Sequence, residues 1–412
     1  MLGAQCVYRC YDRQGNRCKS LKSSEINFCF GGTGVLLTLT NGWTRRLAFA
    51  VGVIFWALCM QASAQQWSWT SEKVGRGLTS SIALDPAHNI HVTYLTKEAS
   101  VYYAFRPLGA SKWFYIKVVD STHSVEHIFP RVTVDNNGSP HLCVGFGVLL
   151  YIALQNQKWV TQEIDPHSGT LSYHCSVAVG PDGTPHLSWY HEYLPGGKQY
   201  THFRHAGLEN GVWVVRSVDG GISGKWNSMV IDSKGFPHAS YSQWAAGGDL
   251  RYAEWDGTSW NITTVDSSNN SSTYRGFDNS LALAPDGSAH ISYFDARTLK
   301  YAHQNRGKWV IEKVDVVAPG YDFYGGSTTV LLDSNGNPHI IYGDFGAVKH
   351  AFWDGKKWQI ETVVSGAVQQ YNNVDAAIGP KDTLYVSYPD PEDGFVKVAT
   401  GRLSSSTQVT KK

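Results

Sequence analysis

The side chains best suited to acid–base chemistry gather in one stretch of the chain. Between residues 123 and 192 the sequence carries histidines, an arginine, tyrosines and carboxylates that do not recur at equivalent places elsewhere. β-Elimination beside a uronate needs a group that neutralises the carboxylate, a base for the α-proton and an acid for the leaving oxygen, roles that Arg, His and Tyr can fill. The residues predicted for these roles, from position alone, are His127, Arg131, Tyr173 and His174.

A second set of side chains is typical of a sugar-binding surface. Aromatic rings stack on the apolar faces of pyranoses, and Asp, Asn and Arg side chains bind the hydroxyls. The predicted ligand-binding residues are His123, Glu126, His191, Trp226, Trp244, Tyr274, Arg275, Asp295, Arg297, Tyr321, Asp322, Tyr324, Asp344 and Tyr371. Lys225 and Asp278 lie in the same segments. The alternative is that these segments only cap the fold and contact solvent.

Composition limits the classes of protein. The chain has 412 residues, with 35 Lys and Arg against 34 Asp and Glu, and charged residues make up only 17%. Nucleic-acid binding depends on basic side chains that neutralise phosphates, so no nucleic-acid partner is predicted. Aromatic residues make up 13%, including 15 Trp and 22 Tyr. This aromatic content excludes a disordered or coiled-coil chain.

The N-terminal region has the order of a signal peptide. Arg45 and Arg46 precede the apolar run 47–60, and Ala62-Ser63-Ala64 follows, which predicts a signal peptide over 45–64 cleaved near Ala64. The apolar run is too short for a bilayer core, so a permanent anchor is the weaker alternative and no stable membrane span is predicted in the mature chain. The protein is therefore predicted to be secreted or periplasmic. Residues 1–44 are interpreted as an extension from a start codon placed too early, or as disordered.

The cysteines favour neither a metal site nor a disulfide scaffold. The spacing of the first four cysteines, Cys6, Cys10, Cys18 and Cys29, lacks the C-x-x-C pairs of a zinc site. Only Cys143 and Cys175 remain after the predicted cleavage. Whether these two pair is left open by the sequence, and no metal or cofactor is predicted.

A unit of about 50 residues repeats along the mature chain, which is the signature of a repeat architecture. Its first anchor is a histidine in an apolar strand, found at His91, His141, His186, His238, His290 and His339, with Tyr385 in the seventh place. Its second anchor is a tryptophan five residues before a valine or isoleucine, at Trp113, Trp159, Trp213, Trp260, Trp309 and Trp358, and also at Trp69 before the first histidine.

Each unit divides into four short strands bounded by turn residues. In the fifth unit the expected strands are 280–283, 290–294, 299–303 and 309–314. The mature chain begins with one fourth strand at Trp69, continues through six units and ends with three strands, the last over 395–399. This predicts an all-β fold, a seven-bladed β-propeller over 65–400 with four antiparallel strands in each blade. The N-terminal strand pairs into the last blade and closes the ring, and 401–412 is a disordered tail.

The four-strand unit resembles the blades of secreted bacterial propellers in the sialidase-like (BNR-repeat) and lectin-like superfamily. The sialidase Asp-box, S-x-D-x-G-x-x-W, is not matched, because Asp256-Gly257-Thr258-Ser259-Trp260 stands at that turn. Some propellers of this kind are polysaccharide lyases with His, Tyr and Arg in their sites. The resemblance therefore implies a carbohydrate ligand.

Function is expected where the units differ. A residue repeated in every blade points in seven directions, so the equivalent histidines are predicted to be structural and to hydrogen-bond between blades. The fourth-to-first linkers and the second-to-third loops share one end of the ring, and the non-repeating residues fall on them. The leading hypothesis is a secreted, monomeric, non-catalytic propeller that binds a glycan or another cell-surface polymer. The alternatives are a polysaccharide lyase, less favourably a sialidase-like glycoside hydrolase, and a protein-interaction scaffold.

Overall fold

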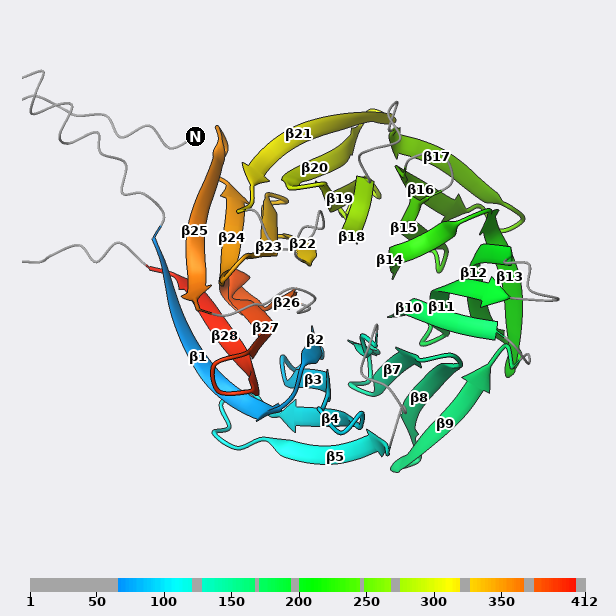
Figure 1. Ribbon diagram of the computed structural model, residues 1–412, viewed down its shortest axis with the longest axis horizontal. Coiled ribbons are helices and arrows are strands. Elements are labelled where there is room, and N and C mark those ends of the chain that lie inside the picture. The colour runs from blue at the N-terminus through cyan, green and yellow to red at the C-terminus, as the bar shows by residue number, and fades with distance from the viewer. Residues whose placement is uncertain are drawn as a thin grey trace, which may run out of the picture. The chain divides into compact units, whose positions relative to one another are not determined.

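A computed structural model describes residues 66–120, 128–166, 170–193, 200–244, 248–267, 275–318, 327–366 and 374–404. The predicted signal peptide and the residues before it lie outside this range. Residues 67–404 form one compact unit. Within it the described strands form seven four-stranded antiparallel sheets arranged as blades around a ring (Figure 1). The predicted seven-bladed propeller is therefore confirmed.

Each blade runs from an innermost first strand to an outermost fourth strand. The strands of blades one to three are β2 (Thr79–Leu84), β3 (Ile90–Leu95), β4 (Val101–Arg106) and β5 (Phe114–Val119); β6 (Arg131–Val134), β7 (Pro140–Gly145), β8 (Leu149–Gln155) and β9 (Lys158–Ile164); and β10 (Thr170–Val179), β11 (Pro185–Tyr193), β12 (Tyr200–Glu209) and β13 (Val212–Gly220).

The next three blades follow the same order, and blade seven takes its fourth strand from the other end of the chain. Their strands are β14 (Ser223–Ile231), β15 (Pro237–Gln243), β16 (Asp249–Trp255) and β17 (Trp260–Asp266); β18 (Arg275–Leu283), β19 (Ala289–Asp295), β20 (Thr298–Asn305) and β21 (Lys308–Val316); β22 (Thr328–Leu332), β23 (Pro338–Asp344), β24 (Ala347–Trp353) and β25 (Trp358–Ser365); and β26 (Asp375–Ile378), β27 (Leu384–Asp390), β28 (Phe395–Leu403) and β1 (Trp67–Arg76). A 3-10 turn, η2 (Pro380–Asp382), joins β26 to β27.

The first and last strands of the described chain close the ring. β1 pairs antiparallel with β28, and the register runs from Trp67 opposite Leu403 to Arg76 opposite Phe395 (Figure 1). Pairing with β1 extends β28 to Leu403, three residues beyond the predicted boundary at residue 400. Closure leaves no blade one strand short, so the outer edge of β28 is paired with β1 and is not free.

The turns at one end of the blades are built by aspartate and glycine, as the sequence predicts. Between β14 and β15, the Gly235 N–H donates to the Asp232 carbonyl, and Gly235 has a φ of 88°. The Asp232 carboxylate accepts the backbone N–H groups of Lys234 and Phe236 at 2.9 and 2.8 Å. The aspartate thus stabilises its own turn. Among the described residues, no cluster of three or more metal-binding side chains is found.

The repeated aromatic residues pack between blades. The Tyr103 ring of blade one meets the Trp159 ring of blade two at 4.9 Å, and the same edge contact joins Tyr151 to Trp213. The repeated histidines correct one prediction, because their hydrogen bonds lie within a blade. His91 Nδ1 lies 2.7 Å from the Tyr103 hydroxyl on the neighbouring strand. A side chain on a second strand reaches the third strand of its own sheet more easily than the next sheet, about 10 Å away.

A polar contact joins the end of each of three fourth strands to the following blade. The Asp219 carboxylate of blade three accepts hydrogen bonds from the Tyr241 hydroxyl at 2.9 Å and from Arg251 at 2.8 Å, both in blade four. Equivalent contacts are Tyr293 and Lys300 with Asp266, and Tyr342 and Lys349 with Asp315. Hydrogen bonds to a charged group are among the stronger ones in proteins, so these contacts fix how the blades sit against each other.

Among the described residues, no helix is long and apolar enough to cross a membrane.

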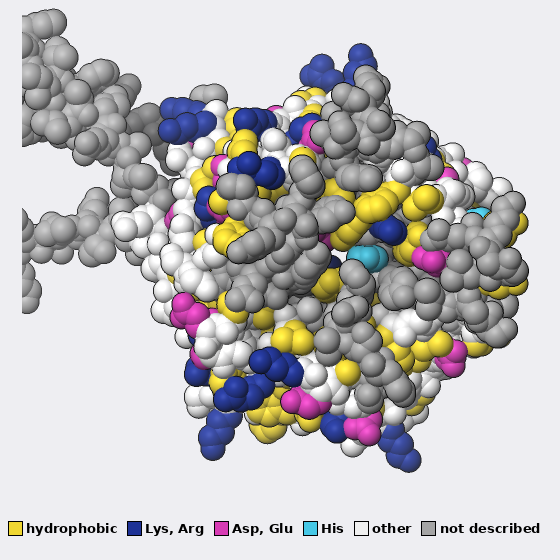
Figure 2. All heavy atoms as spheres, viewed as in Figure 1, with side chains coloured by type: hydrophobic (Ala, Val, Ile, Leu, Met, Phe, Trp, Pro, Cys, Tyr) yellow, Lys and Arg dark blue, Asp and Glu magenta, His cyan; other side chains and the backbone are white. Residues whose placement is uncertain are grey.

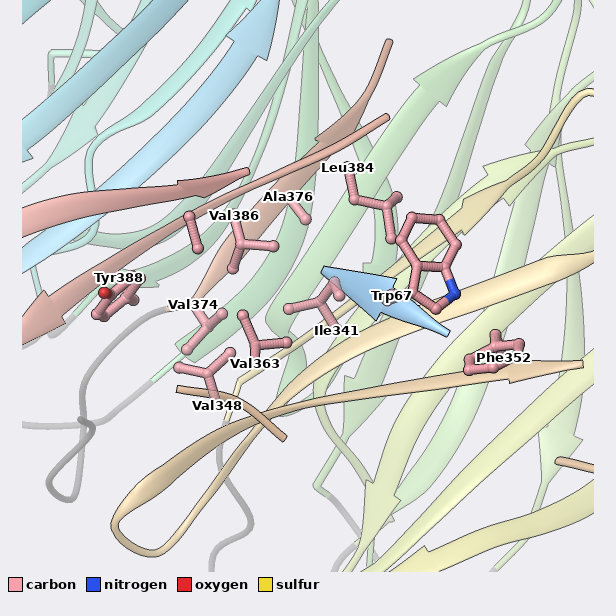
Figure 3. Packing of buried hydrophobic residues seen from close by; sticks show 11 residues of the cluster. Trp67, Ile341, Val348, Phe352, Val363, Val374, Ala376, Leu384, Val386 and Tyr388 are labelled. Atoms are coloured by element: carbon pink, nitrogen blue, oxygen red, sulfur yellow. The ribbon is translucent and has the colours of Figure 1, made fainter. Parts of the chain in front are cut away.

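Trp67 provides a test of ring closure. Its side chain is buried between blades six and seven, among Ile341, Phe352 and Leu384 (Figure 3). We expect Trp67→Ala to lower the free energy of unfolding by about 3 to 5 kcal/mol, because it leaves a cavity in this core. Urea unfolding followed by tryptophan fluorescence measures the effect. Phe114→Ala, which changes an exposed aromatic residue on β5, is the control and should shift stability by no more than about 0.5 kcal/mol. Equal effects would contradict the role of β1.

Candidate functional site

The innermost strands of all seven blades stand around the centre of the ring (Figure 1). Their side chains line a central channel of about 380 Å³. At one level of this channel, the first strand of most blades carries a residue with a hydroxyl side chain. This residue stands two positions before the one that pairs with the repeated histidine, or with Tyr385 in blade seven. The residues at this position are Ser81, Arg131, Ser176, Ser228, Ser280, Thr329 and Asp375. Five blades therefore follow one rule, and Arg131 and Asp375 are the two charged exceptions.

The hydroxyl residues hold neighbouring first strands together. Ser176 Oγ accepts the Met229 N–H, and Ser228 Oγ accepts the Leu281 N–H, both at 3.1 Å. Ser280 Oγ accepts the Val330 N–H at the same distance. Each bond satisfies a backbone donor that faces the channel rather than a strand of its own sheet. A small hydroxyl side chain is thus sufficient to link neighbouring first strands at this level of the ring.

Three consecutive blades distort their first strands at the channel mouth. In β10, Tyr173 pairs with Tyr190 and Ser176 pairs with Ser188, so one extra residue is inserted, and β14 and β18 repeat this one-residue bulge. The first bulged residue has a positive φ in each case, namely His174 (49°), Trp226 (46°) and Asp278 (42°). A left-handed backbone is costly for a side chain of this size, and glycine is the usual residue in such a bulge. Such strain is typical of functional sites.

Each bulge is connected to a neighbouring blade. The Asn227 side chain donates to the carbonyls of His174 and Gly224, and the Asn279 side chain donates to the carbonyls of Trp226 and Gly276. In blade three the equivalent position is Cys175, which forms a disulfide with Cys143 of blade two. The question of pairing that the sequence left open is thereby answered. Cys175, Asn227 and Asn279, which follow the three strained residues, thus tie each bulge to the preceding blade.

The bulged residues meet in a small hollow at the channel mouth, which we term the mouth niche. It has a volume of about 20 Å³ and opens beside the channel. Its lining residues are Phe129, Arg131, His174, Cys175, Trp226, Asn227, Asp278 and Asn279. Seen down the ring axis, the described surface near the centre of the molecule shows hydrophobic side chains with a histidine and a basic side chain among them (Figure 2).

Aromatic rings form one wall of the mouth niche. The His174 ring stacks on Phe129 with a centroid distance of 5.9 Å and lies 5.2 Å from the Trp226 ring. Trp226 in turn packs edge-on against Phe277 at 4.4 Å and lies near Trp244 at 5.5 Å. The wall is therefore supported from behind and presents flat apolar faces beside polar groups.

Charged groups form the opposite part of the mouth niche. Burial raises the pKa of Asp278 to about 7, although the positive charge of Arg131 opposes this shift. Arg131 also forms an ion pair with Asp375, with 3.8 Å between Nη1 and Oδ2. A carboxyl group that titrates near neutral pH beside an arginine and a histidine can donate or accept a proton.

The structure gathers three of the predicted residues, Arg131, His174 and Trp226, in the mouth niche. Four others make structural contacts elsewhere. His191 is buried 3.8 Å from Asp165. Asp295 and Asp344 pair with Lys300 and Lys349, and Arg297 donates to the Val317 carbonyl.

Trp244 stands behind Trp226, where the Lys225 ammonium lies 4.1 Å from its ring centre. Burial lowers the pKa of Lys225, and the charge of Glu192 opposes this shift. The remaining predicted residues, His123, Glu126, His127, Tyr274, Tyr321, Asp322, Tyr324 and Tyr371, lie outside the described residues. The side chains of Tyr173 and Arg275 also lie outside the description.

Sequence reasoning missed Phe129 and Asp375. Asp375 had a readable signal, because aligning the first strands of the repeats places it opposite Ser and Thr residues. Phe129 had none, because it precedes β6 in a linker that follows no repeat pattern. Asp278 was recognised as a non-repeating residue, but the elevation of its pKa depends on burial that only the fold creates.

Comparison with known proteins extends the fold assignment. No protein-family model and no curated protein matches the chain. Among solved structures, the BP39L lectin from Burkholderia pseudomallei is similar with a TM-score of 0.59 and 11% identity, covering 81% of this chain and 97% of the lectin. The polysaccharide lyase Uly1 is similar with a TM-score of 0.55 and 11% identity, covering 84% and 94%.

A protein of unknown function from Dyadobacter fermentans is similar with a TM-score of 0.51 and 12% identity, covering 81% of this chain and 99% of that one. Identities this low show a shared propeller fold and no more. Membership of the sialidase-like superfamily stays a prediction.

The pKa of Asp278 predicts a pH dependence of stability. Its folded-state pKa of about 7 lies above the ordinary value of 3.8, so the native state holds a proton that the unfolded state releases between these two values. Stability contributed by this group is therefore complete below about pH 4 and is lost as the pH rises to about 7.

We expect the free energy of unfolding of the wild type to fall, relative to that of Asp278→Asn, as the pH rises over this range. Urea unfolding at several pH values measures this difference. The buried histidines titrate in both proteins and cancel in the difference. A difference that does not change with pH would contradict the assignment.

Proposed function

We propose that this protein binds a glycan at the mouth of its central channel. The observation that carries the proposal is the set of three non-glycine residues, His174, Trp226 and Asp278, that occupy left-handed bulges and line one niche. The fold does not require these residue types there, because blades one and six form the same first strand without a bulge. Strain maintained in three adjacent blades at one place supports a selected function.

The chemistry of the mouth niche suits a sugar. Phe129, His174 and Trp226 provide flat faces for the apolar side of a pyranose, and Arg131 and Asp278 provide a donor group and a carboxyl group for hydroxyls. The niche itself holds little more than one water-sized group. A bound sugar would place one substituent in the niche and extend over the adjoining channel mouth. Two of the similar structures are a lectin and a polysaccharide lyase by name, which agrees with a carbohydrate ligand.

Trp226 tests glycan binding. The wild type is screened against immobilised polysaccharides and oligosaccharides, and a bound glycan is titrated by calorimetry. We expect Trp226→Ala to weaken binding by about tenfold or more, or about 1.4 kcal/mol, because a stacking surface is lost. Trp255→Ala is the matched control, since Trp255 ends β16 at the turn end of blade four. If the wild type binds none of the plant, algal and bacterial glycans, the proposal is wrong.

Polysaccharide lyase activity is the second candidate function. It is favoured by a carboxyl group with a pKa of about 7 that shares the mouth niche with Arg131 and His174. In this scheme His174 or Asp278 removes the proton next to a uronate carboxylate, and Arg131 stabilises the charge that develops on it. The two electrons of the broken C–H bond form the new C=C bond, and the glycosidic oxygen leaves with a proton. His127 and Tyr173 stay predicted members of this site.

Ultraviolet absorbance of the unsaturated product separates a lyase from a binding protein. If the protein is a lyase, absorbance rises with time on a uronate polymer, and His174→Ala slows this rise by about a hundredfold. His88→Asn is the control, because His88 lies in the turn between β2 and β3 at the far end of the ring. Binding of the polymer without any rise in absorbance would leave glycan binding as the function and exclude the lyase on that substrate.

A further inference from the structure

Arg131 occupies a position where the propeller needs only a hydroxyl. Five blades place Ser or Thr at this level of the channel, and in four of them the hydroxyl accepts a backbone N–H from the next blade. A long cationic side chain is therefore not a requirement of the ring. It is also costly to place a charge in a cavity unless that charge has a partner.

The described part of the chain leaves most of the hydrogen-bonding capacity of Arg131 unused. A guanidinium has five N–H donors, and among the described residues its one charged contact within 4 Å is Asp375, at 3.8 Å. That distance is too long for a hydrogen bond. About one third of the Arg131 side chain is exposed. It borders both the channel and the mouth niche.

Asp375 is already occupied by other donors. Its Oδ2 accepts the Ser81 hydroxyl at 2.6 Å and the Ile82 N–H at 3.2 Å. Its Oδ1 accepts the Ala376 N–H at 2.9 Å and the Thr329 hydroxyl at 3.2 Å. A carboxylate has about four acceptor sites, so these four donors fill them. Asp375 therefore neutralises part of the positive charge of Arg131 but accepts no hydrogen bond from it.

The other polar groups around Arg131 do not supply a fixed anion near neutral pH. Asp278 on β18 has its pKa raised to about 7 by burial, so much of it is uncharged there. His174 on β10 carries no negative charge in any state. The lining residues are uncharged on β14 (Trp226, Asn227 and Ser228) and on β22 (Thr328, Thr329 and Leu331).

We propose that Arg131 binds an anionic substituent of the glycan, a carboxylate or a sulfate, so that the ligand of this propeller is an acidic polysaccharide. The inference rests on the proposed function and specifies its ligand class. A guanidinium can bind either anion through two parallel N–H···O bonds, which ammonium groups cannot reproduce. The exposed donors point to the ligand because no described protein group uses them.

The test compares charged and neutral polymers of matched backbone. Polygalacturonate is paired with its methyl-esterified form, and dextran sulfate with dextran, and binding is titrated by calorimetry at constant ionic strength. We expect the wild type to bind the charged member of at least one pair tenfold or more tightly. A preference in the first pair identifies a carboxylate, and a preference in the second identifies a sulfate. Both results support the inference.

Arg131→Ser is the decisive variant, because it installs the residue that other blades carry at this level and should fold normally. It is expected to abolish the preference for the charged polymer, because it weakens binding of the charged member more than binding of the neutral one. Arg131→Lys should restore part of the preference, since it keeps the charge but not the paired donors. Ser280→Thr, at the same level in blade five, is the matched control and should retain the full preference.

A pH series adds a readout that a structural role of Arg131 would not move. Ionisation of Asp278 places a negative charge beside Arg131, so the preference should fall as the pH rises through about 7, and Asp278→Asn should remove that fall. Equal affinity for charged and neutral polymers, or an unchanged preference in Arg131→Ser, would overturn the inference while glycan binding stands. A wild type that binds no glycan at all would instead remove the proposed function.

Discussion

Pairing of β1 with β28 is the contact on which the rest of the structure depends. Without it, blade seven has three strands and the ring has an open edge. With it, seven first strands are brought around one channel, and each must present a side chain to that channel at the same level. The hydroxyls of Ser176, Ser228 and Ser280 satisfy this requirement by accepting a backbone N–H from the next blade. The regular blades therefore share a hydroxyl side chain at this level, and a blade with another residue there departs from the rule.

The candidate site consists of such exceptions. His174, Trp226 and Asp278 sit in left-handed bulges that cost of order 1 to 3 kcal/mol each. A frame of seven packed blades can tolerate this cost because Asn227, Asn279 and the Cys143–Cys175 disulfide hold the bulges from neighbouring blades. The disulfide replaces an amide contact that the next two blades make at the same position. Strain, burial and charge are concentrated where blades two to five meet, and the opposite end of the ring keeps ordinary aspartate turns.

The fold was predictable because one aromatic unit recurs and its turns are marked by Asp and Gly. The arrangement of blades follows from the spacing of residues such as His91 and Trp159, and ring closure follows from the lone strand at Trp69. The site was partly predictable, because Arg131, His174 and Trp226 break the pattern of the repeat. Asp375 can be recognised only from a residue-by-residue alignment of the first strands, where it stands in the place of Ser or Thr. The histidine hydrogen bonds were assigned to the wrong partner because sequence does not tell whether a ring reaches the next strand or the next blade.

The sequence by itself determined the number of blades, the four strands in each and the end of the ring at which the units differ, because these depend on periodicity and on turn residues that act locally. Only the tertiary structure decided which of the differing residues meet. Arg131, His174, Trp226 and Asp278 come from four blades and are 147 positions apart at their extremes. Three of them, His174, Trp226 and Asp278, occupy bulges of their first strands. The pKa of Asp278 and the Arg131 donors that no described residue uses have the same origin, since burial and hydrogen-bond partners exist only after the blades have packed.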